Sequence, residues 1–135
     1  MAGTVTQTIK TYGDVYSFIK VLRIEWTADE DDGSVPDTTI DVTGIQGWSI
    51  FALITTPGTT APTDNYDIVL EDEDEIDLLG GAASNRDNAT TERVSPLFGA
   101  NNPVPVPVTE SMVFKLTGNS VNSASGLVKV LLVRN

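Results

Sequence analysis

Short stretches rich in Val, Ile and Thr alternate along the chain with clusters of Gly, Pro, Asn and Asp. β-Branched and aromatic residues favour strands, and turn residues that recur about every ten residues are typical of a β-sandwich or barrel. The predicted strands are 4–10, 16–27, 38–42, 48–55, 66–71, 76–79, 104–108, 111–116 and 126–133. Eight or nine short strands without crossover helices predict an all-β, antiparallel two-sheet sandwich of the Greek-key or jelly-roll type.

The stretch DVYSFIKVLRIEWTAD fits both a helix and a strand. Helical periodicity would gather Val15, Phe18, Ile19, Leu22 and Trp26 on one face. Period two instead sets Phe18, Leu22, Ile24 and Trp26 against Ile19, Val21, Arg23 and Glu25. The β-branched content favours a strand over residues 16–27. Apolar residues on both faces, here and in 48–55, predict central strands covered on both sides, with a protein interface as the alternative.

The stretch NNPVPVPVTE places a proline at every second position. In a strand, Pro103, Pro105 and Pro107 would present one side without N–H donors, while the valines between them still pair on the other side. Such an edge resists pairing with other chains. A polyproline loop arm is the alternative.

Composition narrows the classes of function. The 135 residues predict one domain, 1–135, in which residues 1–12 form either the first strand or an extended N-terminal arm. A net charge of −11 makes nucleic acid and anionic membrane poor partners. Without Cys and His the chain has no thiol nucleophile, no zinc thiolate site and no Ser-His-Asp triad. The start MAGTVTQTIK lacks the pattern of a signal peptide, so we expect the protein inside a cell or in a particle assembled there.

Two acidic clusters, residues 29–32 and 71–77, are candidates for calcium because Ca²⁺ prefers oxygen ligands. The helical calcium loop requires Gly at its sixth position and Glu at its twelfth. Counted from Asp29, these positions hold Ser34 and Ile40, so this motif is absent. A cation held between two loops remains an alternative to hydrated surface turns.

A pair of carboxylates for glycoside hydrolysis needs two acids that face each other, one of them with a raised pKa. Adjacent acids in a run do not meet that need. We therefore predict no enzyme, and no catalytic, cofactor-binding or metal-binding residue. The predicted turn has Tyr66, Ile68 and Leu70 in the core, hydrated acids at 71–75, and a return to the core at Ile76, Leu78 and Leu79.

Aromatic side chains are the candidates for sugar binding. Trp26 and Tyr66 lie among Leu and Ile in predicted strands, so core packing is the better interpretation for both. Trp48 follows Gly47 at the start of a strand and is the ring we expect to be exposed.

The motifs FIKVLRIEWTAD, TTPGTTAPTDNYDIVLEDEDEIDLLGG, AASNRD, TERV and LTGNSVNSASGLVKVLLVRN, in this order, resemble small β-rich virion proteins of tailed bacteriophages. The resemblance covers residues 18–134. The chain differs from these proteins in the turn after Leu70, which contains only acidic residues where a Gly is expected. It implies a capsid decoration or cement protein in the virion, assembled in the host cytoplasm. Its implied partners are the phage major capsid protein and further copies of itself, as a trimer or dimer. A glycan- or receptor-binding module of the neck or tail is the alternative.

Overall fold

The structure is a computed structural model that describes residues 1–13, 18–98 and 102–134. These residues form strands and loops without a helix, as predicted. The strands are β1 (Thr4–Tyr12), β2 (Ile19–Thr27), β3 (Thr38–Ile40), β4 (Ser49–Pro57), β5 (Asp67–Glu71), β6 (Glu92–Val94), β7 (Leu97–Phe98), β8 (Asn102–Pro103), β9 (Val106–Pro107), β10 (Met112–Thr117) and β11 (Ser125–Val133). No helix in this part of the chain is long and apolar enough to span a membrane.

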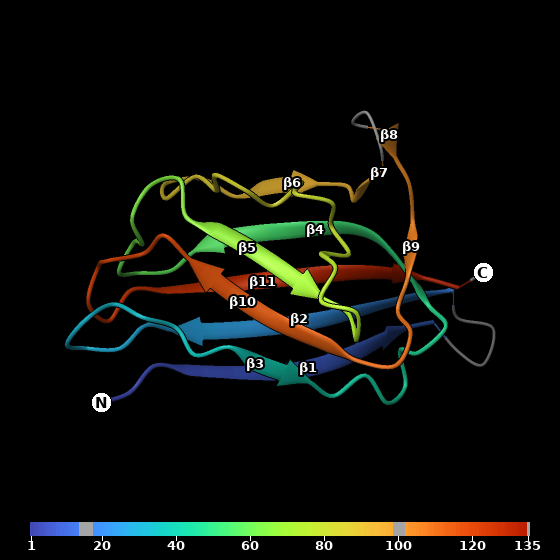
Figure 1. Ribbon diagram of the computed structural model, residues 1–135, viewed down its shortest axis with the longest axis horizontal. Helices are drawn as coiled ribbons and strands as arrows, with labels where there is room; N and C mark the ends of the chain where they lie inside the picture. Colours follow the sequence, from blue (N-terminus) through green and yellow to red (C-terminus); the bar gives the residue numbers. More distant parts are fainter. Residues whose placement is uncertain (14–17, 99–101, 135) are drawn as a thin grey trace.

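The strands form two main layers, which Figure 1 shows with the three-stranded sheet in front of the six-stranded one. The six-stranded sheet has the order β1-β2-β11-β4-β6, and β9 also pairs with β4. The three-stranded sheet has the order β3-β10-β5, and β7 and β8 form a separate ribbon. All of these pairings are antiparallel. The predicted antiparallel arrangement of two sheets is therefore confirmed, although the described residues hold eleven strands rather than eight or nine.

The core lies between the two sheets. In β2, Leu22, Ile24 and Trp26 are buried, as the period-two pattern predicted. Phe18, predicted on the same face, precedes the strand and is 64% exposed, and residues 16 and 17 of the predicted strand lie outside the described residues. Strands on both sides supply the other large core residues: Ile50, Leu53, Val128, Val130 and Leu132 from the large sheet, and Ile40, Ile68, Leu70, Met112, Phe114 and Leu116 from the small one. The rings of Trp26 and Tyr66 are 5.8 Å apart, which confirms that both are core residues. Each fully buried side chain of this kind contributes about 1.5–3 kcal/mol through loss of contact with water.

β1 is an edge strand of the large sheet. It pairs with β2 over its whole length, from Thr4 opposite Thr27 to Tyr12 opposite Ile19. Its inward side chains, Val5 and Ile9, pack against the core while the alternate threonines are exposed.

The predicted strand at 76–79 is wrong, because Asp77 folds this segment into turns. Its carboxylate accepts hydrogen bonds from the backbone N–H groups of Leu70 (3.2 Å), Leu79 (3.0 Å) and Gly81 (2.9 Å). A side chain that bonds to nearby backbone competes with strand pairing. Gly80 then adopts a φ of 60°, and a Cβ there would collide with the carbonyl oxygen of Leu97, so this position requires glycine.

The proline-rich stretch forms two short strands instead of the single strand predicted for 104–108. The amide of Val104 donates to the Pro96 carbonyl (3.0 Å), and that of Val108 donates to the Trp48 carbonyl (2.8 Å). The valine amides therefore pair as expected, but with different segments. The stretch crosses from the β7–β8 ribbon to β4, so one continuous strand cannot form.

Strands β6 and β7 were not predicted. Glu92–Val94 is short, and its strand character comes from pairing with Leu53–Thr55 of β4, which is distant in sequence. Leu97–Phe98 pairs only with β8. Local sequence patterns are weak for strands of two or three residues, because tertiary pairing decides them.

Candidate binding surface and acidic turns

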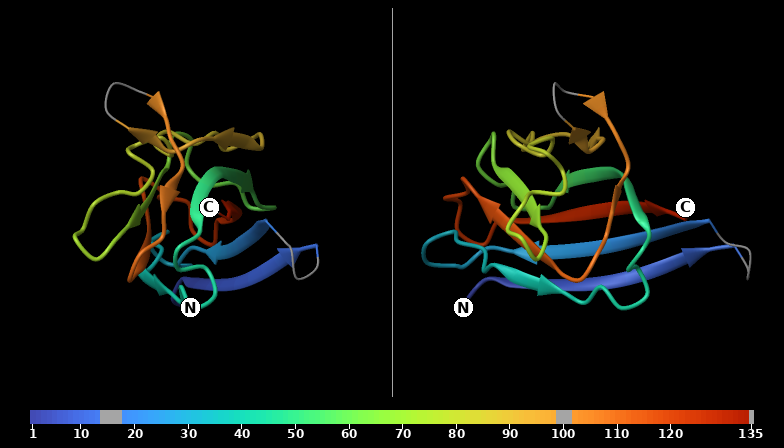
Figure 2. Two further views of the ribbon diagram at one scale, coloured as in Figure 1. Left: turned by 90° about the vertical axis from the view of Figure 1, so that its right-hand side faces the viewer. Right: turned by 45° about the vertical axis from the view of Figure 1, so that its right-hand side comes forward.

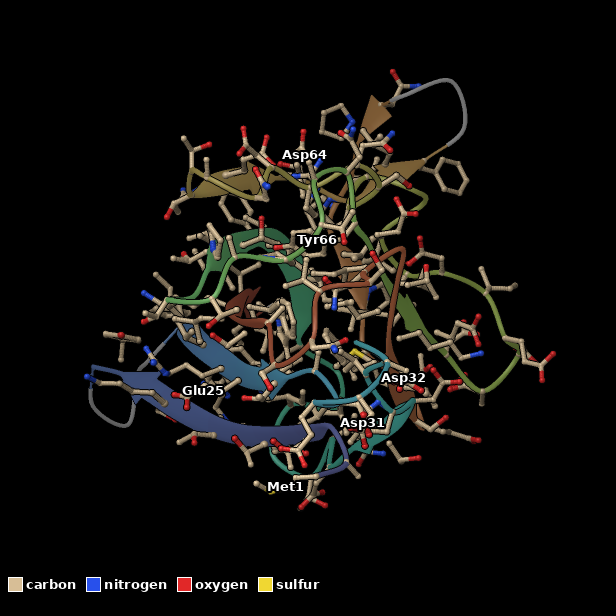
Figure 3. All side chains as sticks on the ribbon, turned by 90° about the vertical axis from the view of Figure 1, so that its left-hand side faces the viewer. Met1, Glu25, Asp31, Asp32, Asp64 and Tyr66 are labelled. Carbon is tan, nitrogen blue, oxygen red and sulfur yellow. The ribbon has the colours of Figure 1, made fainter. Side chains whose placement is uncertain are left out.

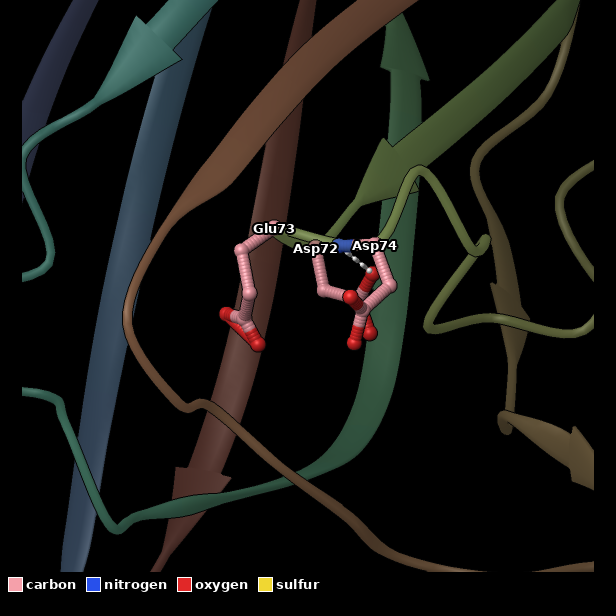
Figure 4. A group of neighbouring side chains, drawn as sticks. All are labelled: Asp72, Glu73 and Asp74. Carbon is pink, nitrogen blue, oxygen red and sulfur yellow. Dashed lines mark hydrogen bonds between the residues drawn. The ribbon is translucent and has the colours of Figure 1, made fainter.

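The acidic turn, defined as residues 72–77, follows β5 and is built by its own carboxylates (Figure 4). The Asp72 carboxylate accepts hydrogen bonds from the backbone N–H groups of Asp74 (2.9 Å) and Ile76 (3.0 Å). Aspartate commonly stabilises a turn in this way. Asp72 therefore holds the turn closed.

Glu73 joins the acidic turn to the loop before β10. Its two carboxylate oxygens accept hydrogen bonds from the Thr109 hydroxyl at 2.8 and 2.7 Å. One of these oxygens also accepts from the backbone N–H groups of Glu110 (3.0 Å) and Ser111 (3.3 Å). This carboxylate is thus a tertiary contact between two loops, rather than the purely hydrated surface acid that the sequence predicted.

Ligand atoms of Asp72, Glu73 and Asp74 lie within 4.8 Å of one another. Two of these three carboxylates already accept hydrogen bonds from protein donors. The proximity of the three acids is therefore explained by the construction of the turn.

The other acidic cluster, 29–32, is also a hydrogen-bonded turn, at the end of the sandwich that Figure 3 shows with Met1, Asp31, Asp32 and Asp64. Asp29 accepts from the amides of Asp31 (2.7 Å) and Asp32 (3.2 Å). Asp32 accepts from the amide of Ser34 (2.8 Å). Both clusters thus lie in exposed loops, as predicted, but the acids shape the loops.

Hydrogen bonds lower the pKa values of four carboxyl groups in the loops. The pKa of Asp32 is lowered by its hydrogen bonds from Ser34, and that of Asp41 by its hydrogen bonds from Thr43. The Thr109 hydroxyl lowers the pKa of Glu73, and the amide of Ala89 lowers that of Asp87. A general acid needs a shift in the opposite direction. These four groups therefore do not fit the paired-carboxylate hypothesis.

Ile76 does not return to the core as predicted. Its side chain is 61% exposed at the tip of the acidic turn, whereas Leu78 and Leu79 are buried. Asp74 and Glu75 beside it are also exposed, and neither carboxylate accepts a hydrogen bond from the described residues. The turn thus presents one apolar side chain beside two exposed carboxylates, of which Glu75 also interacts electrostatically with Lys115.

A polar cluster inside the molecule was not found from the sequence. Arg86 is buried, donates to the carbonyls of Ala82 and Ser84, and lies 3.5 Å from the Glu92 carboxylate. Burial raises the pKa of the neighbouring Tyr66 to about 12. The sequence separation of Tyr66, Arg86 and Glu92 does not predict this cluster, because Glu92 reaches it through the pairing of β6 with β4.

Trp48 is the more exposed of the two tryptophans, but its ring is not free. It is half-buried against the core, and the ammonium group of Lys20 lies 4.6 Å from its ring centroid. This cation–π contact occupies one face of the ring.

The outer face of the six-stranded sheet is defined here as the side opposite the core. No further sheet or helix covers it within the described part of the chain (Figure 2). The predicted coverage of β2 and β4 on both sides holds for single outward residues, since Val21 and Ala52 are buried, but no second layer supplies it. Exposed apolar side chains on or beside it include Tyr12 (47%), Ile19 (46%) and Phe51 (49%). Tyr12 and Ile19 are cross-strand partners at one end of this face, so at least two of these side chains are neighbours.

The same face gathers positive charge. Side chains alternate between the two faces of a strand, and four of the eight Lys and Arg residues point outward: Lys10, Arg23, Lys129 and Arg93. Among the five strands of the sheet path, Glu25 is the acid that points outward, and it pairs with Arg23 at 3.2 Å. A basic and apolar surface therefore exists in a chain whose net charge is −11.

A hollow of about 530 Å³ lies in this face. Its lining combines three cations, Lys10, Arg23 and Lys129, with five other residues, Tyr12, Ile19, Val21, Ile54 and Leu131. The hollow was not predicted from the sequence, because the register of four strands brings its residues together from positions 10 to 131.

A comparison of the chain with protein-family models, curated proteins and solved structures found no match.

Proposed function

We propose that the chain is a non-enzymatic structural component of a tailed-bacteriophage virion. It acts there as a capsid decoration or cement protein, binding the major capsid protein and stabilising the shell. The observation that carries this proposal is the uncovered outer face of the six-stranded sheet, where exposed apolar side chains lie beside cations. Apolar centres with polar surroundings are typical of protein–protein interfaces.

Two further features support a mechanical role. The large buried side chains form one core between the sheets, and the acidic side chains with lowered pKa values close loops. The order of the sequence motifs described above resembles that of small virion proteins. We also propose that the sandwich is of the Greek-key or jelly-roll type, because the chain passes repeatedly between the sheets and the last strand, β11, lies between β2 and β4.

The test is binding of the purified protein to mature capsids that lack it. We expect co-sedimentation with the capsids and a rise in the temperature at which they release DNA. Absence of both binding and stabilisation overturns the assignment as a decoration protein.

Two exposed phenylalanines offer a matched pair of variants. Phe51 lies at a bulge of β4, where Ile50 beside it is turned inward, and Phe98 lies on the separate ribbon. We expect Phe51→Ser to weaken capsid binding at least tenfold, which corresponds to about 1.4 kcal/mol, and Phe98→Ser to leave it unchanged. Equal effects of both variants would contradict a role for the outer face.

A further inference from the structure

We propose that the hollow on the outer face of the six-stranded sheet binds the acidic turn, residues 72–77, of a second copy of the chain. The contact is head-to-tail, because the turn of one copy meets the sheet face of the next. This inference goes beyond the proposed function, since it concerns contact between copies of the chain without a capsid. Both partners would use the outer face, so a bound copy and the capsid protein exclude each other there.

Charge complementarity is the first argument. The hollow is lined by Lys10, Arg23 and Lys129. The acidic turn exposes Asp74 and Glu75, whose carboxylates accept no hydrogen bond from the described part of the chain. Opposite charges that meet across an interface fix its orientation and exclude other pairings.

The second argument is an unfavourable pair within the sheet. Arg23 and Lys129 are direct cross-strand partners in the β2–β11 pairing. Like charges placed opposite each other destabilise a sheet. Glu25 already pairs with Arg23 at 3.2 Å, whereas no acidic side chain of the described residues pairs with Lys129. Lys129 is therefore the cation of this pair that a carboxylate of a partner would neutralise.

The third argument is the apolar content of both surfaces. Ile76 is 61% exposed at the tip of the turn, and the hollow offers the side chains of Ile54 and Leu131 beside its cations. Burial of an apolar side chain in such a site adds hydrophobic stabilisation to the charge contacts. The turn thus complements the hollow both in charge and in apolar side chains.

The positions of the two surfaces require a second molecule. The turn follows β5 of the three-stranded sheet and projects on that side, while the outer face of the six-stranded sheet faces the opposite way (Figure 2). A turn cannot reach the hollow of its own chain. A head-to-tail contact of this kind either closes into a ring or continues as an open assembly, and it does not form a two-fold dimer.

Single loops bury less surface than stable interfaces, so we expect weak association that depends on concentration. Sedimentation velocity of the purified full chain, from micromolar to millimolar concentration, measures it. Lys129→Glu and Ile76→Ser should each reduce the association constant at least tenfold. Asp74→Lys should do the same, and the double variant Lys129→Glu/Asp74→Lys should regain association because the charges are exchanged.

A control variant separates this contact from general charge effects. Asp31→Lys changes the net charge by the same amount as Asp74→Lys, but in the loop at 29–32 instead of the acidic turn, and it should associate like the unaltered chain. Circular dichroism and melting curves check that each variant is folded. Ile76→Ser should fold normally, since the side chain is exposed.

Three outcomes overturn the inference: a chain that stays monomeric up to millimolar concentration, association that none of the three single variants weakens, or a double variant that is no better than either parent. Capsid binding by a strictly monomeric chain would leave the proposed function standing. Self-association that follows the expected pattern, without capsid binding, would overturn the proposed function alone.

Discussion

Glu73 accepts hydrogen bonds from Thr109, Glu110 and Ser111, so one exposed side chain links two loops. The acidic residues of this chain therefore have separate roles according to what their oxygens contact. Asp72 and Asp77 close turns. Asp74 beside them carries a free carboxylate available to a partner.

Glu73→Ala should lower the melting temperature, whereas Asp74→Ala should not, because only Glu73 accepts hydrogen bonds from another loop. The pKa of Glu73 is lowered from its ordinary value of 4.5, so its contribution to stability is present above that pH. The contribution is lost as the pH falls through the lowered value. Melting curves of both variants and the unaltered chain, from neutral to strongly acidic pH, measure this difference.

At acid pH the unaltered chain and Glu73→Ala should converge in melting temperature. A difference that persists or grows as the solution is acidified would contradict the assigned role. Equal melting temperatures at neutral pH would do the same.

Tyr66→Phe should make the fold less sensitive to alkali. Burial raises the pKa of Tyr66 from 10.0 to about 12, so the neutral form is favoured in the folded state. Its contribution is fully present below pH 10 and is lost as the pH rises toward 12, by on the order of 3 kcal/mol. Urea unfolding at several alkaline pH values should show a smaller loss for Tyr66→Phe. Identical pH profiles would show that Tyr66 ionises without unfolding.

At the scale of elements, the pairing of β2 with β11 fixes both faces of the large sheet. The register that places Leu22 opposite Val130 in the core also places Arg23 opposite Lys129 outside. A shift by one residue would exchange these faces. Hydrophobic burial thus determines the register, and the basic row on the outer face follows from it.

Lys129→Glu should stabilise the isolated monomer. The substitution replaces a like-charge cross-strand pair by an opposite-charge pair with Arg23, and such a pair is worth about 0.2–1 kcal/mol. The gain should lie at the lower end of this range, because Glu25 already pairs with Arg23. Urea unfolding in dilute solution measures the change, and Lys129→Gln should lie between the two. A loss of stability in Lys129→Glu would contradict this account of the pair.

At the scale of the whole molecule, one core joins the two layers. Phe114 of the three-stranded sheet and Trp26 of the six-stranded sheet belong to the same buried cluster. Neither sheet buries its inner face without the other. We therefore expect the layers to unfold together.

Phe114→Ala should reduce the free energy of unfolding by about 3–5 kcal/mol, because it leaves a cavity in the shared core. Phe98→Ala, at a side chain that is 70% exposed, should change it by less than about 0.5 kcal/mol. Tryptophan fluorescence and far-ultraviolet circular dichroism should give the same transition in the unaltered chain. Two separate transitions would show that the layers are independent.

The sequence by itself determined the strand class, the antiparallel arrangement and the inward faces of the longer strands. Burial imposes a period of two on residues such as Leu22, Ile24 and Trp26, and this period is visible without a structure. The loop positions of both acidic clusters followed from the same pattern. The proline-rich stretch and residues 76–79 were predicted less well, because distant partners and the Asp77 carboxylate decide their conformation.

Only the tertiary structure decided what the polar residues do. Lys10, Arg23, Arg93 and Lys129 are scattered in the sequence, and strand register gathers them on one face. Glu73 and Thr109 meet through two loops that no local pattern connects. Hydrophobic periodicity is a local property of a strand, whereas a binding surface or a contact between loops depends on which strands become neighbours.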